Sequence, residues 1–324
     1  MSNSLIQHLL AHMEQYFGKA VSRREFMKAQ GIGTLLLASA TSGITAPRVI
    51  HAAEVPYIGV AVGDPAKAAR AAVDILGGMK AFVKPGNKVL IKPNMSFAEG
   101  VDSGTNTHPE IIRELVAMCR EAGASRVRVL DHPLRPTELC VQEAKDACRI
   151  FGEDIVHALR KSDFYTEVAI PQGSSLKKTD VMKDVLDSDV LIAAPVAKSH
   201  GSTGVSLSMK GMMGLVWSRA IMHWRYDLNN SIVDLCTLLK PKLVMIDGTR
   251  VLSTNGPGGP GIVLRPKTVI VSRDMVAADA YAVQTFEWYG KKMEPHQVRH
   301  IRIAQERGLG RIDIGNLVTR KIVL

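Results

Sequence analysis

The segment VLIAAPVAKSHGSTGVSLSMKG, residues 190–211, contains the transition that decides the fold. Its first five residues, Val190 to Ala194, are all apolar, as in a strand that is buried on both faces of a parallel sheet. Lysines, a histidine, glycines and serines follow directly. Because ligands of open α/β sheets bind beyond the carboxyl ends of the strands, this segment predicts a buried strand that ends at a binding site.

The same alternation of short apolar runs and helical patterns extends along the chain. The clearest helix is expected over Pro109 to Ala122, where Ile111, Ile112 and Leu115 share one apolar stripe. Strands are predicted at 57–62, 88–91, 126–130, 190–194, 243–246 and 268–271, and further helices at 64–76, 137–151, 231–239, 275–287 and 295–305. This order predicts an α/β fold with a largely parallel, buried sheet flanked by helices.

Polar residues follow five of these strands directly. They are Lys92-Pro93-Asn94, Asp131-His132, Lys198-Ser199-His200, Asp247-Gly248 and Asp274. We expect these strand ends to converge on one ligand crevice. The predicted binding residues there are Lys92, Asn94, Asp131, Lys198 and Asp247, although an aspartate in this position can also cap a turn.

The small residues of the segment 195–211 allow the backbone to approach a ligand closely. Ser206 and Ser208 can donate to anionic oxygens, while Lys198 and Lys210 supply positive charge. These residues are candidates for holding a cofactor, with His200 and Lys210 as candidate catalytic groups. The alternative is a glycine- and serine-rich surface loop whose lysines are only solvated.

Thr107 and His108 immediately precede the clearest helix. Thr107 is a candidate cofactor-binding residue, although capping of exposed backbone amides alone would also explain it. A histidine near the positive end of a helix stays neutral and can ligate a metal or exchange a proton, so His108 is a catalytic candidate. Two further features stay open. The loop 255–261 matches no nucleotide fingerprint and is expected to form a lid or turn, and His223 with Arg225 is either a substrate-facing patch or part of ordinary packing.

The N-terminal region carries a pair of arginines in a specific context. Arg23 and Arg24 are preceded by Ser22 and followed by Phe26 and Lys28, and a weakly apolar run begins at residue 31. This pattern predicts a twin-arginine signal with its h-region in residues 1–53, and a single α/β domain in residues 54–324. The protein is then periplasmic after export by the twin-arginine translocase, or membrane-anchored if the signal is not cleaved.

Composition and charge restrict the function. The chain has 324 residues, 46% hydrophobic and 22% charged, with a net charge of +10, of which about +7 remains without residues 1–53. The basic residues are scattered rather than clustered, which disfavours nucleic acid and agrees with an anionic small molecule. None of the four cysteines forms a Cys-x-x-Cys pair, so an iron–sulfur cluster bound by this chain alone is not expected.

The mature chain, over approximately residues 55–271, resembles the domain-of-unknown-function family 362. The resemblance rests on VLIKPN at residues 89–94, TNTHP at residues 105–109, and APVAKSHG at residues 194–201 followed by Lys210-Gly211. Many members of that family carry ferredoxin-like cysteine motifs, which this sequence lacks. The resemblance therefore does not imply electron transfer by this chain alone.

A more distant resemblance is to the nickel-pincer-nucleotide lactate racemase family. It rests on Thr107-His108 before a helix, and on His200 followed ten residues later by Lys210. The resemblance implies that Lys210 holds a cofactor or faces its phosphate, that His200 ligates a metal, and that His108 transfers a proton. Ser206 and Ser208 replace much of the glycine-dense loop of those enzymes.

Together these features predict an exported enzyme that binds an anionic small molecule, or a metal- or phosphate-bearing cofactor, at the strand ends. The alternative is a non-catalytic cofactor-binding or maturation protein that serves a periplasmic redox partner.

Overall fold

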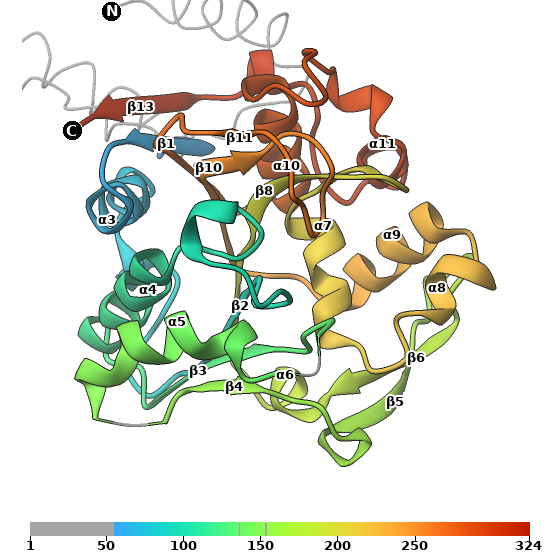
Figure 1. Cartoon of the computed structure of the whole chain (residues 1–324), viewed down its shortest axis with the longest axis horizontal. Helices are drawn as coiled ribbons and strands as arrows, with labels where there is room; N and C mark the ends of the chain where they lie inside the picture. The colour runs from blue at the N-terminus through green and yellow to red at the C-terminus, as the bar shows by residue number, and fades with distance from the viewer. Residues whose placement is uncertain (1–54, 136, 153) are drawn as a thin grey trace, which may run out of the picture. The chain divides into compact units, whose positions relative to one another are not determined.

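The computed structural model describes residues 55–135, 137–152 and 154–324. Within them, eleven strands form one sheet (Figure 1). Its main order is β13 (Thr319–Val323), β1 (Ile58–Val62), β12 (Thr268–Ser272), β10 (Leu243–Leu252), β7 (Val190–Ala194), β2 (Lys88–Pro93), β3 (Arg126–Asp131) and β4 (Val156–Ala158). The export residues Arg23, Arg24, Phe26 and Lys28 lie outside the described residues, and the domain boundary at residue 54 stays a prediction.

The centre of the sheet is parallel, as predicted. Strands β10, β7, β2, β3 and β4 all pair in parallel. Strand β12 runs antiparallel to both of its neighbours, β10 and β1. The carboxyl end of β12 therefore lies beside the amino ends of the parallel strands, and not beside their carboxyl ends.

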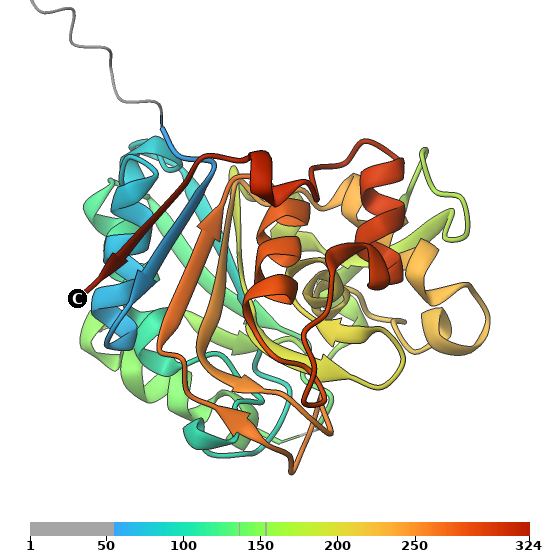
Figure 2. The ribbon, with the colours of Figure 1, turned by 90° about the horizontal axis from the view of Figure 1, so that it is seen from above.

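Helices cover both faces of the sheet (Figure 2). One face carries α3 (Pro65–Ile75), α4 (Pro109–Glu121) and α5 (Leu139–Cys148), and the other carries α9 (Leu228–Leu238), α10 (Met275–Thr285) and α11 (Arg299–Glu306). Alternate residues of one strand belong to the two cores: Val89 and Ile91 pack with α3 and α4, while Leu90 packs on the other side. Burial on both faces explains the continuous apolar runs in the sequence.

The smaller elements complete the fold. They are the short helices α6 (Lys183–Leu186), α7 (Ser208–Gly211) and α8 (Ile221–Trp224), the short strand β11 (Val263–Leu264), which pairs with β10, and a separate antiparallel pair, β5 (Tyr165–Ala169) and β6 (Lys178–Met182). All four cysteines are buried and free. Among the described residues, no helix is long and apolar enough to cross a membrane.

Two parts of the sequence prediction were wrong in extent. No strand was predicted after residue 194, whereas residues 196–200 form β8 (Val196–His200) and residues 204–206 form β9 (Gly204–Ser206). Strand β8 pairs with β9 and with the far end of β10. Strand β10 itself continues six residues beyond Ile246 to Leu252. Tertiary pairing with distant segments thus overrides the polar, turn-like local sequence.

Candidate functional site

A cavity of about 460 Å³ lies beyond the carboxyl ends of β2 and β3, where β8 and α7 also contribute its walls. Seven of the residues that the sequence singled out line it: Lys92, Asn94, Asp131, Lys198, His200, Ser206 and Lys210. Segments more than one hundred residues apart in the sequence therefore meet at one place. The convergence is the one expected for strand ends in an open α/β sheet.

The cavity is strongly cationic. Lys92, Lys198, Lys210 and Arg219 line it, and Asp131 is the one carboxylate among its described lining residues. The exposed fraction of Lys92 and of Lys198 is only 2%. Burial of ammonium groups without matching anions is costly, so the wall is arranged for a negative charge that the protein does not itself supply.

Lys92 and Asp131 form the buried ion pair at the base of this cavity. The Lys92 Nζ atom lies 3.1 Å from Asp131 Oδ1. The carboxylate also accepts hydrogen bonds from the backbone N–H groups of Met95, at 2.8 Å, and of His132, at 2.9 Å. Burial lowers the pKa of Lys92, while the charge of Asp131 acts in the opposite direction. A side chain at Gly214 would collide with this pair, since an added Cβ would lie 2.4 Å from Asp131 Oδ1.

Lys198 extends from β8 into the same space. Its Nζ atom donates to the carbonyl oxygen of Thr105 at 2.6 Å and lies 5.0 Å from the centroid of the Phe97 ring. Burial lowers the pKa of Lys198 to about 7, with the charges of Lys92 and Lys210 adding to the effect. Lys198 therefore gains or loses its proton near neutral pH.

Lys210 is positioned by the short helix α7. The start of this helix is fixed by Asp279 of α10, which accepts from Ser208 Oγ at 2.6 Å, from Ser208 N at 2.9 Å and from Met209 N at 2.9 Å. Ser208 is thus used in holding α7 and does not line the cavity, whereas Ser206 does. Burial lowers the pKa of Lys210 to about 8, and the charge of Arg219 contributes.

His200 is a neutral group in the cavity wall. Burial, followed by the charge of Lys210, lowers its pKa to about 3. Its Nδ1 atom accepts from the backbone N–H of Ser202 at 3.2 Å, so the proton of the neutral ring is on Nε2. The ring centroid of His223, which also lines the cavity, lies 6.2 Å away. His200 can therefore donate one hydrogen bond to a ligand without carrying charge.

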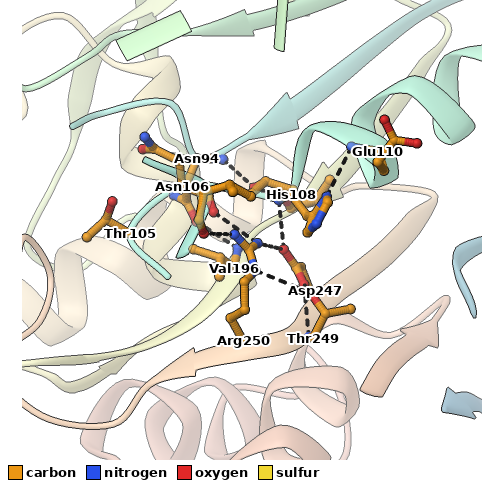
Figure 3. A network of polar contacts seen from close by, with 12 residues as sticks. Asn94, Thr105, Asn106, His108, Glu110, Val196, Asp247, Thr249 and Arg250 are labelled. Atoms are coloured by element: carbon orange, nitrogen blue, oxygen red, sulfur yellow. Dashed lines mark hydrogen bonds and ion pairs between the residues drawn. The ribbon is translucent and has the colours of Figure 1, made fainter. Parts of the chain in front are cut away.

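Asp247 belongs to a neighbouring polar network instead of the cavity (Figure 3). Its carboxylate is fully buried and pairs with Arg250 at 2.7 Å. It also accepts from the Thr249 hydroxyl at 2.6 Å and from the backbone N–H of His108 at 2.8 Å. Arg250 in turn donates to the carbonyl oxygen of Asn106 at 3.3 Å. These contacts fasten the loop before α4 to strand β10, which is a structural role for Asp247.

His108 lies in this network (Figure 3), and neither His108 nor Thr107 is among the cavity lining residues. His108, rather than Thr107, is the N-cap of α4, since its Nδ1 atom accepts from Glu110 N at 3.2 Å. Burial lowers the pKa of His108, and the Arg250 charge adds to the effect. Thr107 instead donates to the carbonyl oxygen of Ala194 at 2.7 Å and accepts from Asn94 N at 2.8 Å. The structure therefore does not bring His108 together with His200 and Lys210.

Asp274 lies away from the cavity in which it was expected, whereas the loop 255–261 contains a turn at residues 256–258, in agreement with the expected lid or turn. Asp274 caps α10 by accepting from Val276 N at 2.8 Å and from Ala277 N at 3.0 Å, because the antiparallel β12 ends away from the cavity. The glycine-rich loop 255–261 is tied to β8 by a hydrogen bond of 2.9 Å from Gly256 N to Ser199 Oγ. Pro257 of this loop lines the cavity, so the loop forms part of its wall.

Three residues that line the cavity were not among the site residues predicted from the sequence. Arg219, Trp224 and Phe97 line the cavity, but none of them follows a predicted strand. Of the patch left open, His223 lines the cavity, whereas Arg225 lies 6.0 Å from the Tyr226 ring and is exposed. The one available signal was the gathering of aromatic and basic residues between positions 217 and 226.

The described residues contain no group of three or more His, Cys, Asp or Glu side chains placed to hold a metal ion. His200 and His223 are the two imidazoles of the cavity wall. The cavity thus offers a phosphate or carboxylate several cations, and a metal at most a small part of a protein ligand set. The assignment of His200 as a metal ligand, which the resemblance implies, stays a prediction.

Residues 89–284 match the family described as "Domain of unknown function (DUF362)". The chain belongs to the DUF362 family. This DUF362 protein is 26% identical, over 197 residues, to the thylakoid-associated protein sll1697 of Synechocystis sp. (strain ATCC 27184 / PCC 6803 / Kazusa). That match covers 58% of this chain and 60% of the relative, so the chain spans less than two thirds of the relative's length.

Among solved structures, the DUF362 chain is similar to the lactate racemase apoprotein from Thermoanaerobacterium thermosaccharolyticum. The sequence identity is 16% and the TM-score 0.38, and the match covers 64% of this chain and 54% of the other.

Proposed function

We propose that this DUF362 protein binds an anionic small molecule or cofactor, through a phosphate or carboxylate group, in the cavity at the strand ends. The observation that carries the proposal is the gathering of Lys92, Lys198, Lys210 and Arg219 around one cavity, in which Asp131 is the single carboxylate among the described lining residues. In a partly dry site, hydrogen bonds from such cations to an anion are shorter and stronger than those between neutral groups. His200 adds a neutral donor.

The same residues support acid–base chemistry on the bound molecule. A general acid or base works best when its pKa is near the operating pH, and burial lowers the pKa of Lys198 to about 7 and that of Lys210 to about 8. We therefore infer an enzyme in which Lys210 or Lys198 exchanges a proton with the ligand. A non-catalytic protein that holds a cofactor for a periplasmic redox partner would use the same cations and release its ligand chemically unchanged.

The cavity residues suit one part of a nickel-pincer-nucleotide cofactor better than the other. The phosphate of such a cofactor fits the cavity, because Lys92, Lys198 and Arg219 are available to bind it and Lys210 to hold it. The metal of such a cofactor has His200 as its nearest match in the wall, without a set of three or more described ligands. The proposal therefore rests on the anionic group and not on a metal.

Titration calorimetry with sulfate tests the proposal, because the charge of sulfate is constant between about pH 6 and pH 9. One site with a dissociation constant of about 1 mM or lower is expected near pH 6. Absence of saturable binding would overturn the proposal.

The affinity for sulfate is expected to fall at least about tenfold as the pH rises from 6 to 9. Lys198, with a pKa of about 7, and Lys210, with a pKa of about 8, both lose their protons over this interval. Bound sulfate favours the protonated forms, so the complex takes up protons when it forms near pH 8. Calorimetry in two buffers with different ionisation enthalpies measures that uptake. A constant affinity up to pH 9 would contradict the lowered pKa values.

We also propose that residues 1–53 direct the folded protein through the twin-arginine translocase to the periplasm. The support is the sequence around Arg23 and Arg24. Replacing both arginines with lysine keeps their charge and is expected to leave full-length protein in the cytoplasm, as fractionation and immunoblotting would show. Unchanged export of the Arg23→Lys, Arg24→Lys variant would rule out this route.

A further inference from the structure

The mouth of the cationic cavity carries two large apolar side chains that are exposed. Trp224, the last residue of α8, is 73% exposed and Leu134, which follows β3, is 53% exposed. Both line the cavity. An exposed tryptophan beside a polar pocket leaves a large apolar surface in water, which is typical of a surface that a ligand covers.

Trp224 differs from the other two tryptophans of the chain in its surroundings. Trp288 is fully buried, and its Nε1 atom donates to the carbonyl oxygen of Val283 at 2.9 Å. Trp217 stacks on His132, with ring centroids 5.0 Å apart and an interplanar angle of 4°. Within the described residues, the side chain of Trp224 has neither a ring partner nor a hydrogen-bond partner. Folding of this part of the chain therefore does not account for its side chain.

The lining residues of the cavity divide into two zones. The cations Lys92 and Lys198 are almost fully buried, whereas Trp224 and Leu134 are exposed at the entrance. Phe97, which also lines the cavity, has its ring centroid 5.0 Å from Lys198 Nζ and is itself buried. A ligand that satisfies both zones has a charged group at one end and an apolar group at the other.

We propose that the ligand is an anion with a planar aromatic group, which stacks on the indole of Trp224 while its phosphate or carboxylate binds the buried lysines. This inference rests on the proposed function and names its ligand class. A flat ring covers the indole face more completely than an alkyl chain does, and stacking on an aromatic side chain tolerates many ring types. Leu134 packs against the edge of the bound ring.

Three sulfonates test the proposal, because all are monoanions between about pH 6 and pH 9 and differ only in their organic part. Methanesulfonate provides the charge alone, 2-naphthalenesulfonate adds a planar ring, and 1-octanesulfonate adds an alkyl chain. Calorimetry is expected to show that the naphthyl compound binds about tenfold or more tighter than methanesulfonate. Octanesulfonate is expected to gain clearly less than the naphthyl compound.

The Trp224→Ala variant isolates the indole. The ratio between the affinities for naphthalenesulfonate and for methanesulfonate is expected to fall to about threefold or less. Phe164→Ala removes an aromatic residue that is 42% exposed and does not line the cavity, and it should leave the wild-type ratio unchanged.

The outcomes separate the two proposals. Failure of sulfate to bind the wild type would overturn the proposed function itself. Binding of methanesulfonate with no gain for the naphthyl compound would leave the anion site standing and overturn the aromatic ligand. An equal gain for octanesulfonate, or an unchanged ratio in Trp224→Ala, would also overturn it.

Discussion

Lys210→Ala is expected to weaken sulfate binding near pH 6 by roughly 10- to 100-fold. A hydrogen bond between a charged donor and an anion contributes about 1.5–3 kcal/mol, and each 1.4 kcal/mol corresponds to a tenfold change in affinity. Lys210 is half-buried, and the partial desolvation of its ammonium group, which lowers its pKa to about 8, strengthens its interaction with a bound anion. Titration calorimetry measures the loss directly.

The matched control is Lys240→Ala, which removes the same charge from an exposed site. Lys240 precedes the amino end of β10, whereas the cavity lies beyond the carboxyl ends of the parallel strands. This control should change the affinity less than about twofold, because exposed charges are screened by salt. Equal losses in both variants would mean that sulfate senses only net charge, and the assignment of Lys210 to the site would be wrong. Circular dichroism and thermal unfolding confirm that each variant is folded.

Strand ends could be predicted from the sequence because a buried parallel strand has a distinctive composition. The apolar runs before Lys92 and Asp131 mark where β2 and β3 approach their carboxyl ends, and the polar side chains there line the cavity. The cavity therefore contains the residues that the alternation pointed to. That part of the site follows from local sequence together with the rule that ligands bind beyond the carboxyl ends of parallel strands.

The direction of a strand is not contained in its local sequence, which explains the misplacement of Asp274. Strand β12 has the same composition as the parallel strands, but it runs antiparallel to β10. Its last residues therefore lie beside the amino ends of the parallel strands, and Asp274 caps a helix there. Only the order of the strands in the complete sheet distinguishes the two cases.

The length of β10 was underestimated for an energetic reason. Asp247 and Gly248 are typical of a turn, yet all ten residues of the strand are buried. The ion pair between Asp247 and Arg250, together with the hydrogen bonds of Asp247 to Thr249, compensates for burying these polar groups. The partners lie three residues apart, but only the loop before α4 completes the network, and that loop is about 140 residues away in the sequence.

Asp131→Ala is expected to have the largest effect on stability, lowering the free energy of unfolding by about 3–5 kcal/mol. The variant leaves the Lys92 ammonium buried without its partner at 3.1 Å. It also removes the acceptor of the backbone N–H groups of Met95 and His132. Glu167→Ala is the control, since it breaks a surface ion pair of 3.0 Å with Lys178, which is worth about 0–1 kcal/mol. Urea unfolding at pH 7 compares the two variants.

The second substitution Lys92→Met distinguishes the cost of the lost ion pair from the cost of the lost backbone hydrogen bonds. In the Asp131→Ala background it removes the orphaned charge, so the double variant is expected to be more stable than Asp131→Ala alone. The two backbone donors stay without their acceptor, and the double variant should therefore remain below the wild type. If Lys92→Met failed to restore any stability, the cost of Asp131→Ala would lie in the backbone hydrogen bonds and not in the buried pair. The cationic base of the cavity would then be stable without its carboxylate.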